Sequence, residues 1–169
     1  LVSRIVGFVV FAVATITYVA TIEPTTSFWD CGEFIASSYK LEVGHPPGNP
    51  VFQLVARFFT MFASPENAAM AVNLMNALCS SLTILFLYLT IMHLGRRLLE
   101  KNGREYLSLS NAIALWGSGT VGALAYCWSD TFWFSAVEGE VYAMSSLLTA
   151  VVFWAMLKWE DEADEPYAN

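Results

Sequence analysis

The composition of this chain is typical of a membrane protein. Of its 169 residues, 56% are hydrophobic and only 14% are charged, which is too apolar for one soluble domain of this length. No basic patch is present, so we expect no nucleic-acid partner. The formal net charge is −7, and all but −2 of it comes from one acidic run near the carboxyl end: Glu160, Asp161, Glu162, Asp164 and Glu165.

Four apolar segments are each long enough to cross a membrane, since about 20 helical residues span the roughly 30 Å hydrocarbon core. The first is not followed by a small-residue cleavage site, so we interpret it as a retained helix and not as a signal peptide. The sequence therefore predicts an all-α, multi-pass integral membrane protein with about four transmembrane helices, at approximately 1–22, 68–94, 109–127 and 141–159.

Basic residues define the expected orientation. The connection 95–108 is short, and short basic loops stay in the cytoplasm. The amino terminus is then cytoplasmic, and the loops at about 23–67 and 128–140 lie outside. The cations that carry this argument are Arg96, Arg97, Lys101 and Arg104.

The second and third spans contain residues suited to packing against other helices. Polar and small side chains interrupt both segments, which predicts contact with protein and not with lipid. Four helices are too few to cover such faces, so we expect the natural protein to continue beyond Asn169. The residues in question are Asn73, Asn76, Ser80, Ser81 and Thr83 in the second span, and Gly117, Gly119 and Gly122 in the third.

The first outer loop, at about 23–67, is predicted to be folded. Its pattern indicates a helix from Ser27 to about Leu41, a turn over 43–48 and an aromatic-rich helix over 50–62. The second helix is too short to cross a membrane, so it is expected to lie at the interface or against the bundle.

Two carboxylates in this loop are candidates for acid–base chemistry. Asp30 and Glu33 are three residues apart, which places both on one face of the predicted helix. Neighbouring like charges raise one pKa, as a general base or acid at neutral pH requires. The plainer interpretation is a capping box, in which Ser27 and Asp30 only begin the helix.

The turn after the predicted helix contains one titratable imidazole. His45 precedes Pro46, Pro47 and Gly48, which make a rigid corner. The loop has only two cations, Lys40 and Arg57, which are the available partners for a phosphate. The plainer interpretation is a turn that contains a histidine, with the two cations solvated at the interface.

Glu138 and Glu140 stand just before the fourth span. Carboxylates at such a position are costly unless they are solvated, paired or used. Two carboxylates without further ligands are weak evidence for a metal, so we assign no metal ligand and leave a divalent cation open.

Three blocks of sequence resemble the DUF2723 family of membrane proteins, which is similar to the protein O-mannosyltransferases and is placed among the GT-C glycosyltransferases. The blocks are residues 23–34, which include Phe28-Trp29-Asp30-Cys31-Gly32-Glu33, residues 44–50, which read Gly-His-Pro-Pro-Gly-Asn-Pro, and residues 131–143. The resemblance implies that this chain is the amino-terminal part of a GT-C-like bundle. It also implies transfer of a mannose-like sugar from a polyprenyl-phosphate donor to a hydroxyl acceptor, such as a protein Ser or Thr, at the outer face of a bacterial inner membrane.

The resemblance also implies roles for single residues. Asp30 matches the essential carboxylate, and His45 matches the His-Pro-Pro element of the mannosyltransferases. Those enzymes place Asp and Glu side by side, whereas here Glu33 follows Asp30 by three residues, so Glu33 remains a rival base. Lys40, Arg57 and His45 are the expected partners of the donor phosphate, and Glu138 and Glu140 are candidate substrate ligands.

Two other classes of function remain open. A transporter subunit would carry polar or charged residues along its span interiors. A membrane scaffold would use the folded loop only to bind lipid or a partner, and its acidic residues would face separate surroundings. The catalytic hypothesis predicts instead that Asp30 and Glu138 or Glu140 converge on one groove beside His45.

Overall fold

The computed structural model describes residues 1–102 and 108–163, and every regular element in these ranges is a helix. Seven are α-helices and one is a single turn of 3-10 helix, which confirms the predicted all-α class. The elements are α1 (Val2–Ala20), α2 (Cys31–Lys40), α3 (Pro50–Thr60), η1 (Pro65–Asn67), α4 (Ala68–Lys101), α5 (Leu109–Cys127), α6 (Asp130–Ala136) and α7 (Val141–Ala163).

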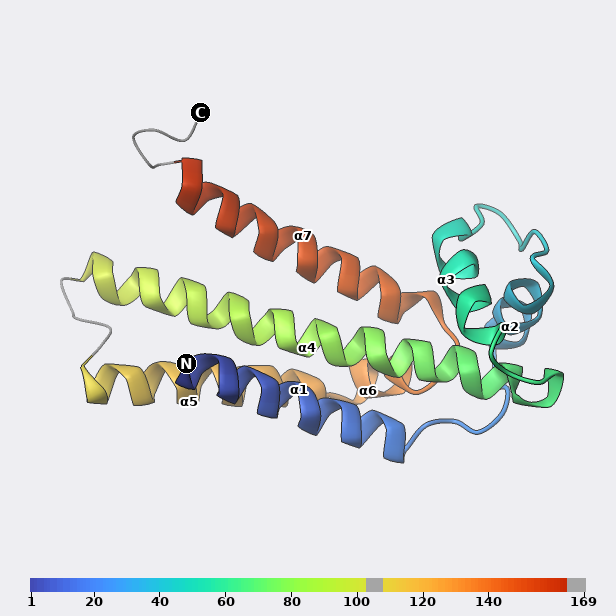
Figure 1. Cartoon of the computed structure of the whole chain (residues 1–169), viewed down its shortest axis with the longest axis horizontal. Coiled ribbons are helices and arrows are strands. Elements are labelled where there is room, and N and C mark those ends of the chain that lie inside the picture. Colours follow the sequence, from blue (N-terminus) through green and yellow to red (C-terminus); the bar gives the residue numbers. More distant parts are fainter. Residues whose placement is uncertain (103–107, 164–169) are drawn as a thin grey trace.

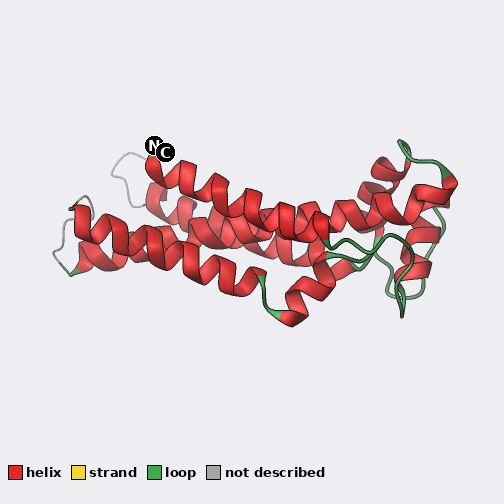
Figure 2. Ribbon diagram, turned by 90° about the horizontal axis from the view of Figure 1, so that it is seen from below, coloured by secondary structure: helices red, strands yellow, loops and turns green. Residues whose placement is uncertain are grey.

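Four long helices, α1, α4, α5 and α7, form an elongated bundle (Figure 1). Helices α2 and α3 lie together at one end of it, which we call the loop end. Helices α1 and α5 run toward the loop end, and helices α4 and α7 run away from it. The view from below shows the same elongated arrangement, with loops gathered at the loop end (Figure 2).

Three helical segments are long and apolar enough to cross a membrane: Val2–Ala20, Pro65–Lys101 and Val141–Ala163. Helix α5 is not among them. It nevertheless connects the two ends of the bundle (Figure 1), and its 19 residues cover roughly 28 Å at 1.5 Å per residue. The chain is a membrane protein, and a crossing by α5 remains a prediction.

Helix α4 is the centre of the fold and packs on both sides. On one side it shares a hydrophobic cluster with α2, α3 and α7, which includes Phe34, Phe52 and Met75. On the other it shares a second cluster with α1, α5 and α6, which includes Tyr18 and Ala123. The polar residues predicted to face protein are all buried in α4: Asn73, Asn76, Ser80, Ser81 and Thr83.

Small residues bring α5 close to α4. The contact was predicted for three glycines and is observed at two of them. A Cβ on Gly119 would lie 3.1 Å from the Tyr88 ring and from the Met92 sulfur, and one on Gly122 would lie 2.9 Å from Ile91. Gly117 has no heavy atom within 4 Å of that position among the described residues. The predicted close contact is therefore confirmed at Gly119 and Gly122 only.

Several predicted helix boundaries were wrong. Helix α2 begins at Cys31 and not at Ser27, because Trp29 has a φ of 60°, which is incompatible with a right-handed helix. Helix α3 ends at Thr60, two residues early. Helix α4 continues to Lys101, so much of the predicted loop 95–108 is helical, and residues 103–107 lie outside the described part.

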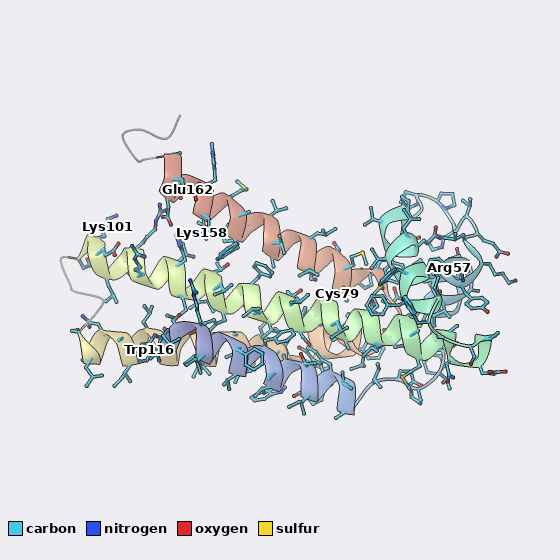
Figure 3. The ribbon with its side chains drawn as sticks, viewed as in Figure 1. Arg57, Cys79, Lys101, Trp116, Lys158 and Glu162 are labelled. Carbon is cyan, nitrogen blue, oxygen red and sulfur yellow. The ribbon has the colours of Figure 1, made fainter. Side chains whose placement is uncertain are left out.

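Ion pairs join α4 to α7 at the end opposite the loop end. Arg97 lies 2.7 Å from Glu160 and 3.2 Å from Asp161, which also lies 2.7 Å from Lys158. Figure 3 shows Lys101, Lys158 and Glu162 at this end, far from Arg57 at the loop end. The predicted acidic run is thus partly paired within the fold, while Asp164 and Glu165 lie outside the described residues.

Helix α2 ends on a strained residue, which gives a test of the local fold. Leu41 is in the left-handed region at φ 56° and ψ 46°, and the Glu42 amide donates to the Ser37 carbonyl at 2.9 Å. This conformation costs a non-glycine residue about 1–2 kcal/mol. Because Leu41 is 55% exposed, its side chain contributes little packing in return.

We predict that Leu41→Gly raises the free energy of unfolding by about 0.5–1 kcal/mol, after allowance for the greater freedom of glycine in the unfolded chain. Thermal unfolding in detergent measures this. The matched control is Val43→Gly, since Val43 is 96% exposed and is not in the left-handed region. Equal losses of stability in both variants would contradict the strain argument.

Candidate functional site

A pocket at the loop end brings together three carboxylates that are distant in sequence. It has a volume of about 270 Å³ and lies between the start of α2 and the segment from α6 to α7. Besides the carboxylates of Asp30, Glu138 and Glu140, it is lined by one hydroxyl and three aromatic side chains: Ser135, Trp29, Phe134 and Tyr142. The predicted convergence of Asp30 with Glu138 and Glu140 is therefore observed, but His45, which was expected beside the same groove, does not line the pocket.

Asp30 occupies the position just before α2 but does not cap it through its side chain. Its backbone carbonyl accepts a hydrogen bond from the Phe34 amide at 3.0 Å, while its carboxylate makes no capping hydrogen bond. Ser27 lies too far upstream to begin a helix that starts at Cys31. The capping-box interpretation was wrong, and the exposed Asp30 carboxylate is left to face the pocket.

Glu138 and Glu140 form the buried wall of the pocket, with exposed fractions of 6% and 7%. Burial raises the pKa of Glu140, and the neighbouring charges of Glu138 and Asp30 raise it further. The pocket therefore holds a carboxyl group that takes up a proton more readily than an ordinary glutamate. Such a group is able to donate a hydrogen bond as well as accept one.

Asn76 of α4 fixes the backbone of this wall. Its side-chain amide is fully buried and donates to the carbonyls of both Glu138 and Glu140, at 2.5 and 2.6 Å. The Glu140 amide closes the same turn by donating to the Glu138 carbonyl at 2.9 Å. One α4 side chain thus holds the two glutamates that face Asp30.

Asn73, one helical turn away, fixes the first loop in the same manner. Its amide donates to the carbonyls of Glu23 and Thr25 at 2.7 and 3.0 Å. The two loops also contact each other directly, since the Glu23 amide donates to the Val137 carbonyl at 3.0 Å. Both sides of the pocket are therefore anchored on one face of α4.

Gly139 permits this close approach. A Cβ at this position would lie 3.1 Å from Oδ1 of Asn73, 3.2 Å from Ile35 and 3.3 Å from the Cys31 sulfur. A larger residue would push the turn between Glu138 and Glu140 away from α2 and α4. The limited space around this position therefore explains why a glycine separates Glu138 and Glu140.

Glu33 faces a different partner. One of its carboxylate oxygens accepts from the His45 amide at 2.6 Å, and the other lies 3.0 Å from Nδ1 of the His45 ring. These hydrogen bonds lower the pKa of Glu33, and the hydrogen bond with Glu33 raises the pKa of His45. Asp30 contributes a smaller rise to the pKa of His45, so the imidazole lies within electrostatic range of the pocket.

The two cations of the first loop do not line this pocket. Lys40 lies 3.7 Å from the Glu42 carboxylate in an exposed pair. Arg57 donates to the Tyr39 carbonyl, and its guanidinium sits 5.5 Å from the centre of the Tyr39 ring. The structure thus brings together Asp30, Glu138 and Glu140, whereas the Glu33–His45 pair, Lys40 and Arg57 do not line this pocket.

No three His, Cys, Asp or Glu side chains among the described residues are arranged to hold a metal ion. The divalent cation left open by the sequence thus lacks a preformed ligand set in this part of the chain.

Reasoning from the sequence missed several residues of the site. Trp29 directly precedes Asp30, and Tyr142 follows Glu140 by two residues. This nearness to the candidate carboxylates in the sequence was the available signal. Asn73 and Asn76 were predicted to face protein, but their partners are backbone carbonyls in distant loops, which no local pattern reveals.

The fold and the pocket together define a class: an all-helical membrane protein with a carboxylate-lined pocket at one end of its bundle. The chain belongs to the family described as Protein O-mannosyl-transferase TMEM260 N-terminal domain, whose model matches residues 30–169. The match supports the resemblance to O-mannosyltransferases; the DUF2723 and GT-C assignments stay expectations. No solved structure matches the chain.

Two curated relatives carry related names. The chain is 27% identical over 146 residues to "Protein O-mannosyl-transferase tmem260" of Dictyostelium discoideum, an alignment that covers 85% of this chain and 16% of the relative. It is 24% identical over 152 residues to "Protein O-mannosyl-transferase TMEM260" of Mus musculus, which covers 90% of this chain and 19% of that relative. The chain thus spans less than a fifth of either relative.

The Glu33–His45 pair predicts a specific pH dependence. Because the pKa of Glu33 is lowered, its stabilising effect is lost as pH falls through that pKa; because the pKa of His45 is raised, its effect is lost as pH rises through that pKa. The pair therefore stabilises the fold most between the ordinary values of a glutamate and a histidine, at about pH 5–6.

We predict that Glu33→Gln returns the pKa of His45 toward the ordinary histidine value of about 6.5. NMR titration of labelled histidine measures this, and His45→Gln assigns the signal. Asp30→Asn is the comparison and lowers the pKa of His45 less, since Asp30 is its weakest contributor. An unchanged pKa in Glu33→Gln would contradict the observed pairing.

We predict that Asn76→Ala lowers the free energy of unfolding by about 2 kcal/mol or more, because it removes two buried hydrogen bonds and leaves the Glu140 carbonyl without its donor. Ser80→Ala is the control, since Ser80 is also fully buried on α4 but its hydroxyl has no hydrogen-bond partner within the described ranges. Denaturant unfolding measures both. Similar small losses in the two variants would show that the Asn76 amide does not hold the wall.

Proposed function

We propose that this chain forms part of a GT-C-type glycosyltransferase. In this proposal a mannose-like sugar passes from a polyprenyl-phosphate donor to a protein Ser or Thr hydroxyl at the outer face of a membrane. The observation that carries it is the pocket that Asp30 shares with Glu138 and Glu140. The names of the two relatives, which are O-mannosyl-transferases, supply the reaction class.

Asp30 is the proposed catalytic base. The acceptor hydroxyl donates to the Asp30 carboxylate, which takes its proton as the oxygen attacks the anomeric carbon and the lipid phosphate leaves. A single displacement of this kind inverts the anomeric centre. Glu33 is the weaker candidate, because its carboxylate is engaged by His45 and its pKa is lowered.

Glu138 and Glu140 are the proposed ligands of sugar hydroxyls. Their carboxylates lie in the same pocket as Asp30 and are held in place through their own backbone carbonyls, which leaves the side chains available. The raised pKa of Glu140 favours the protonated form of this carboxyl group. Its protonation limits repulsion between the three carboxylates when the pocket is occupied.

The leaving phosphate needs positive charge near the pocket but not inside it. His45 fits this role, because Glu33 favours its protonated form and Asp30 is within electrostatic range. The amino terminus of α2, which follows Asp30 directly, adds unpaired amides and a favourable dipole. Lys40 and Arg57 remain proposed only as more distant contributors.

Adjoining cavities supply a path for the lipid of the donor. Ser135 and Tyr142 line both the acidic pocket and a neighbouring cavity of about 350 Å³. Tyr126 and Ser146 line that cavity and a third one of about 440 Å³, which runs between α4 and α7 within the bundle. An isoprenoid chain lying there would bring its phosphate end toward Asp30.

The orientation follows from the proposed chemistry and from the charge distribution. We propose a cytoplasmic amino terminus and an outer position for the loop end, because the basic residues of α4 lie at the opposite end. The expected bacterial inner membrane gains no support from the two relatives, which come from eukaryotes. The transporter alternative predicts polar or charged residues along a span interior; the third cavity has hydroxyl groups but no charged side chain, and the carboxylates gather in the pocket at the loop end.

The decisive variant is Asp30→Asn in the full-length protein. Loss of the base predicts a fall in transfer rate of about 100-fold or more, with donor binding retained. Transfer of radiolabelled sugar from a purified lipid-linked donor to protein measures it. Glu33→Gln is the matched control, and we expect it to retain more activity than Asp30→Asn. Near-normal transfer by Asp30→Asn would overturn Asp30 as base.

A further inference from the structure

We propose that the indole ring of Trp29 is the stacking surface for the sugar ring of the donor. The proposal rests on the proposed transferase function. Trp29 is 90% exposed, yet it lines the same pocket as Asp30, Glu138 and Glu140. An exposed aromatic ring at the wall of an acidic pocket is an unused apolar surface next to hydrogen-bond acceptors.

The backbone of Trp29 is held in a conformation that tryptophan rarely adopts. Its φ is 60°, and a left-handed backbone is a genuine outlier for a bulky residue. Burial of the ring does not offset this strain, because the ring is almost fully exposed. Strain of this kind gathers at functional sites, and here it falls on one of the two adjacent residues, Trp29 and Asp30, with which the start of α2 lines the pocket.

The pocket matches the two chemical faces of a pyranose. A sugar ring has an apolar face of C–H groups and a rim of hydroxyls. The aromatic residues Trp29, Phe134 and Tyr142 suit the apolar face, and the carboxylates suit the hydroxyls. At about 270 Å³ the pocket falls just below the range of about 300–1,000 Å³ typical of drug-sized ligands, so it suits one sugar ring better than a peptide segment.

The competing explanation is that Trp29 anchors the protein at the membrane interface, where tryptophan is common. Phe28 separates the two explanations. It is the neighbouring residue and is 82% exposed, but it does not line the pocket. Anchoring would involve both rings, whereas stacking on a sugar involves Trp29 alone.

The test compares Trp29→Asn, Trp29→Phe and Phe28→Ala in the full-length protein, with KM for the lipid-linked donor, kcat and thermal stability as the measurements. Asparagine tolerates a left-handed backbone, so Trp29→Asn removes the ring without adding strain. We expect it to keep or raise the thermal midpoint while the donor KM rises by roughly tenfold. Trp29→Phe keeps a ring and retains most of the affinity, and Phe28→Ala leaves KM unchanged.

The outcomes separate this inference from the proposed function. An unchanged donor KM in Trp29→Asn, with transfer abolished in Asp30→Asn, would overturn the stacking role and leave the transferase function in place. Equal rises in KM for Trp29→Asn and Phe28→Ala would show that both rings only anchor the loop. Full activity in Asp30→Asn would instead remove the function on which the inference rests.

Discussion

The whole site depends on two buried amides near the start of the apolar helix α4. Asn73 and Asn76 lie one turn apart on α4, and together they donate to four backbone carbonyls, two in each loop. Burying an amide is costly unless it is hydrogen-bonded, so this interaction is stable only when both loops dock. Docking in turn places Asp30 opposite Glu138 and Glu140. The pocket therefore depends on the hydrogen bonds that the amide nitrogens of Asn73 and Asn76 donate to the two loops.

The helical class and most of the element positions could be predicted from the sequence, because long apolar segments and interrupting polar residues are local signals. The start of α2 could not. Ser27 and Asp30 have the spacing of a capping box, but the left-handed backbone of Trp29 overrides it. That conformation brings Trp29 and Asp30 to a pocket completed by residues more than one hundred positions away. Local propensity contains no information about such a partner.

The candidate site was predictable in part for the same reason. Asp30, Glu138 and Glu140 drew attention as carboxylates near a membrane face, and their convergence needed only that the two loops share one end of the bundle. The separate pairing of Glu33 with His45 could not be predicted from the sequence. It depends on how the turn after α2 folds back toward the start of that helix, which brings together two residues twelve positions apart. It distinguishes two carboxylates that the sequence left as rivals: one is engaged by an imidazole and the other is not.

The charges of the site also limit how a donor can lie in it. Three carboxylates line one small pocket, and the pKa of Glu140 is raised by burial and by its two neighbours. A phosphate would meet the same repulsion, whereas a neutral, hydroxyl-rich ring would relieve part of it by donating hydrogen bonds. His45, whose protonated form is favoured by Glu33, does not line this pocket. A neutral sugar ring therefore suits the carboxylate wall better than a phosphate does, and the phosphate of a lipid-linked sugar would lie outside the acidic pocket.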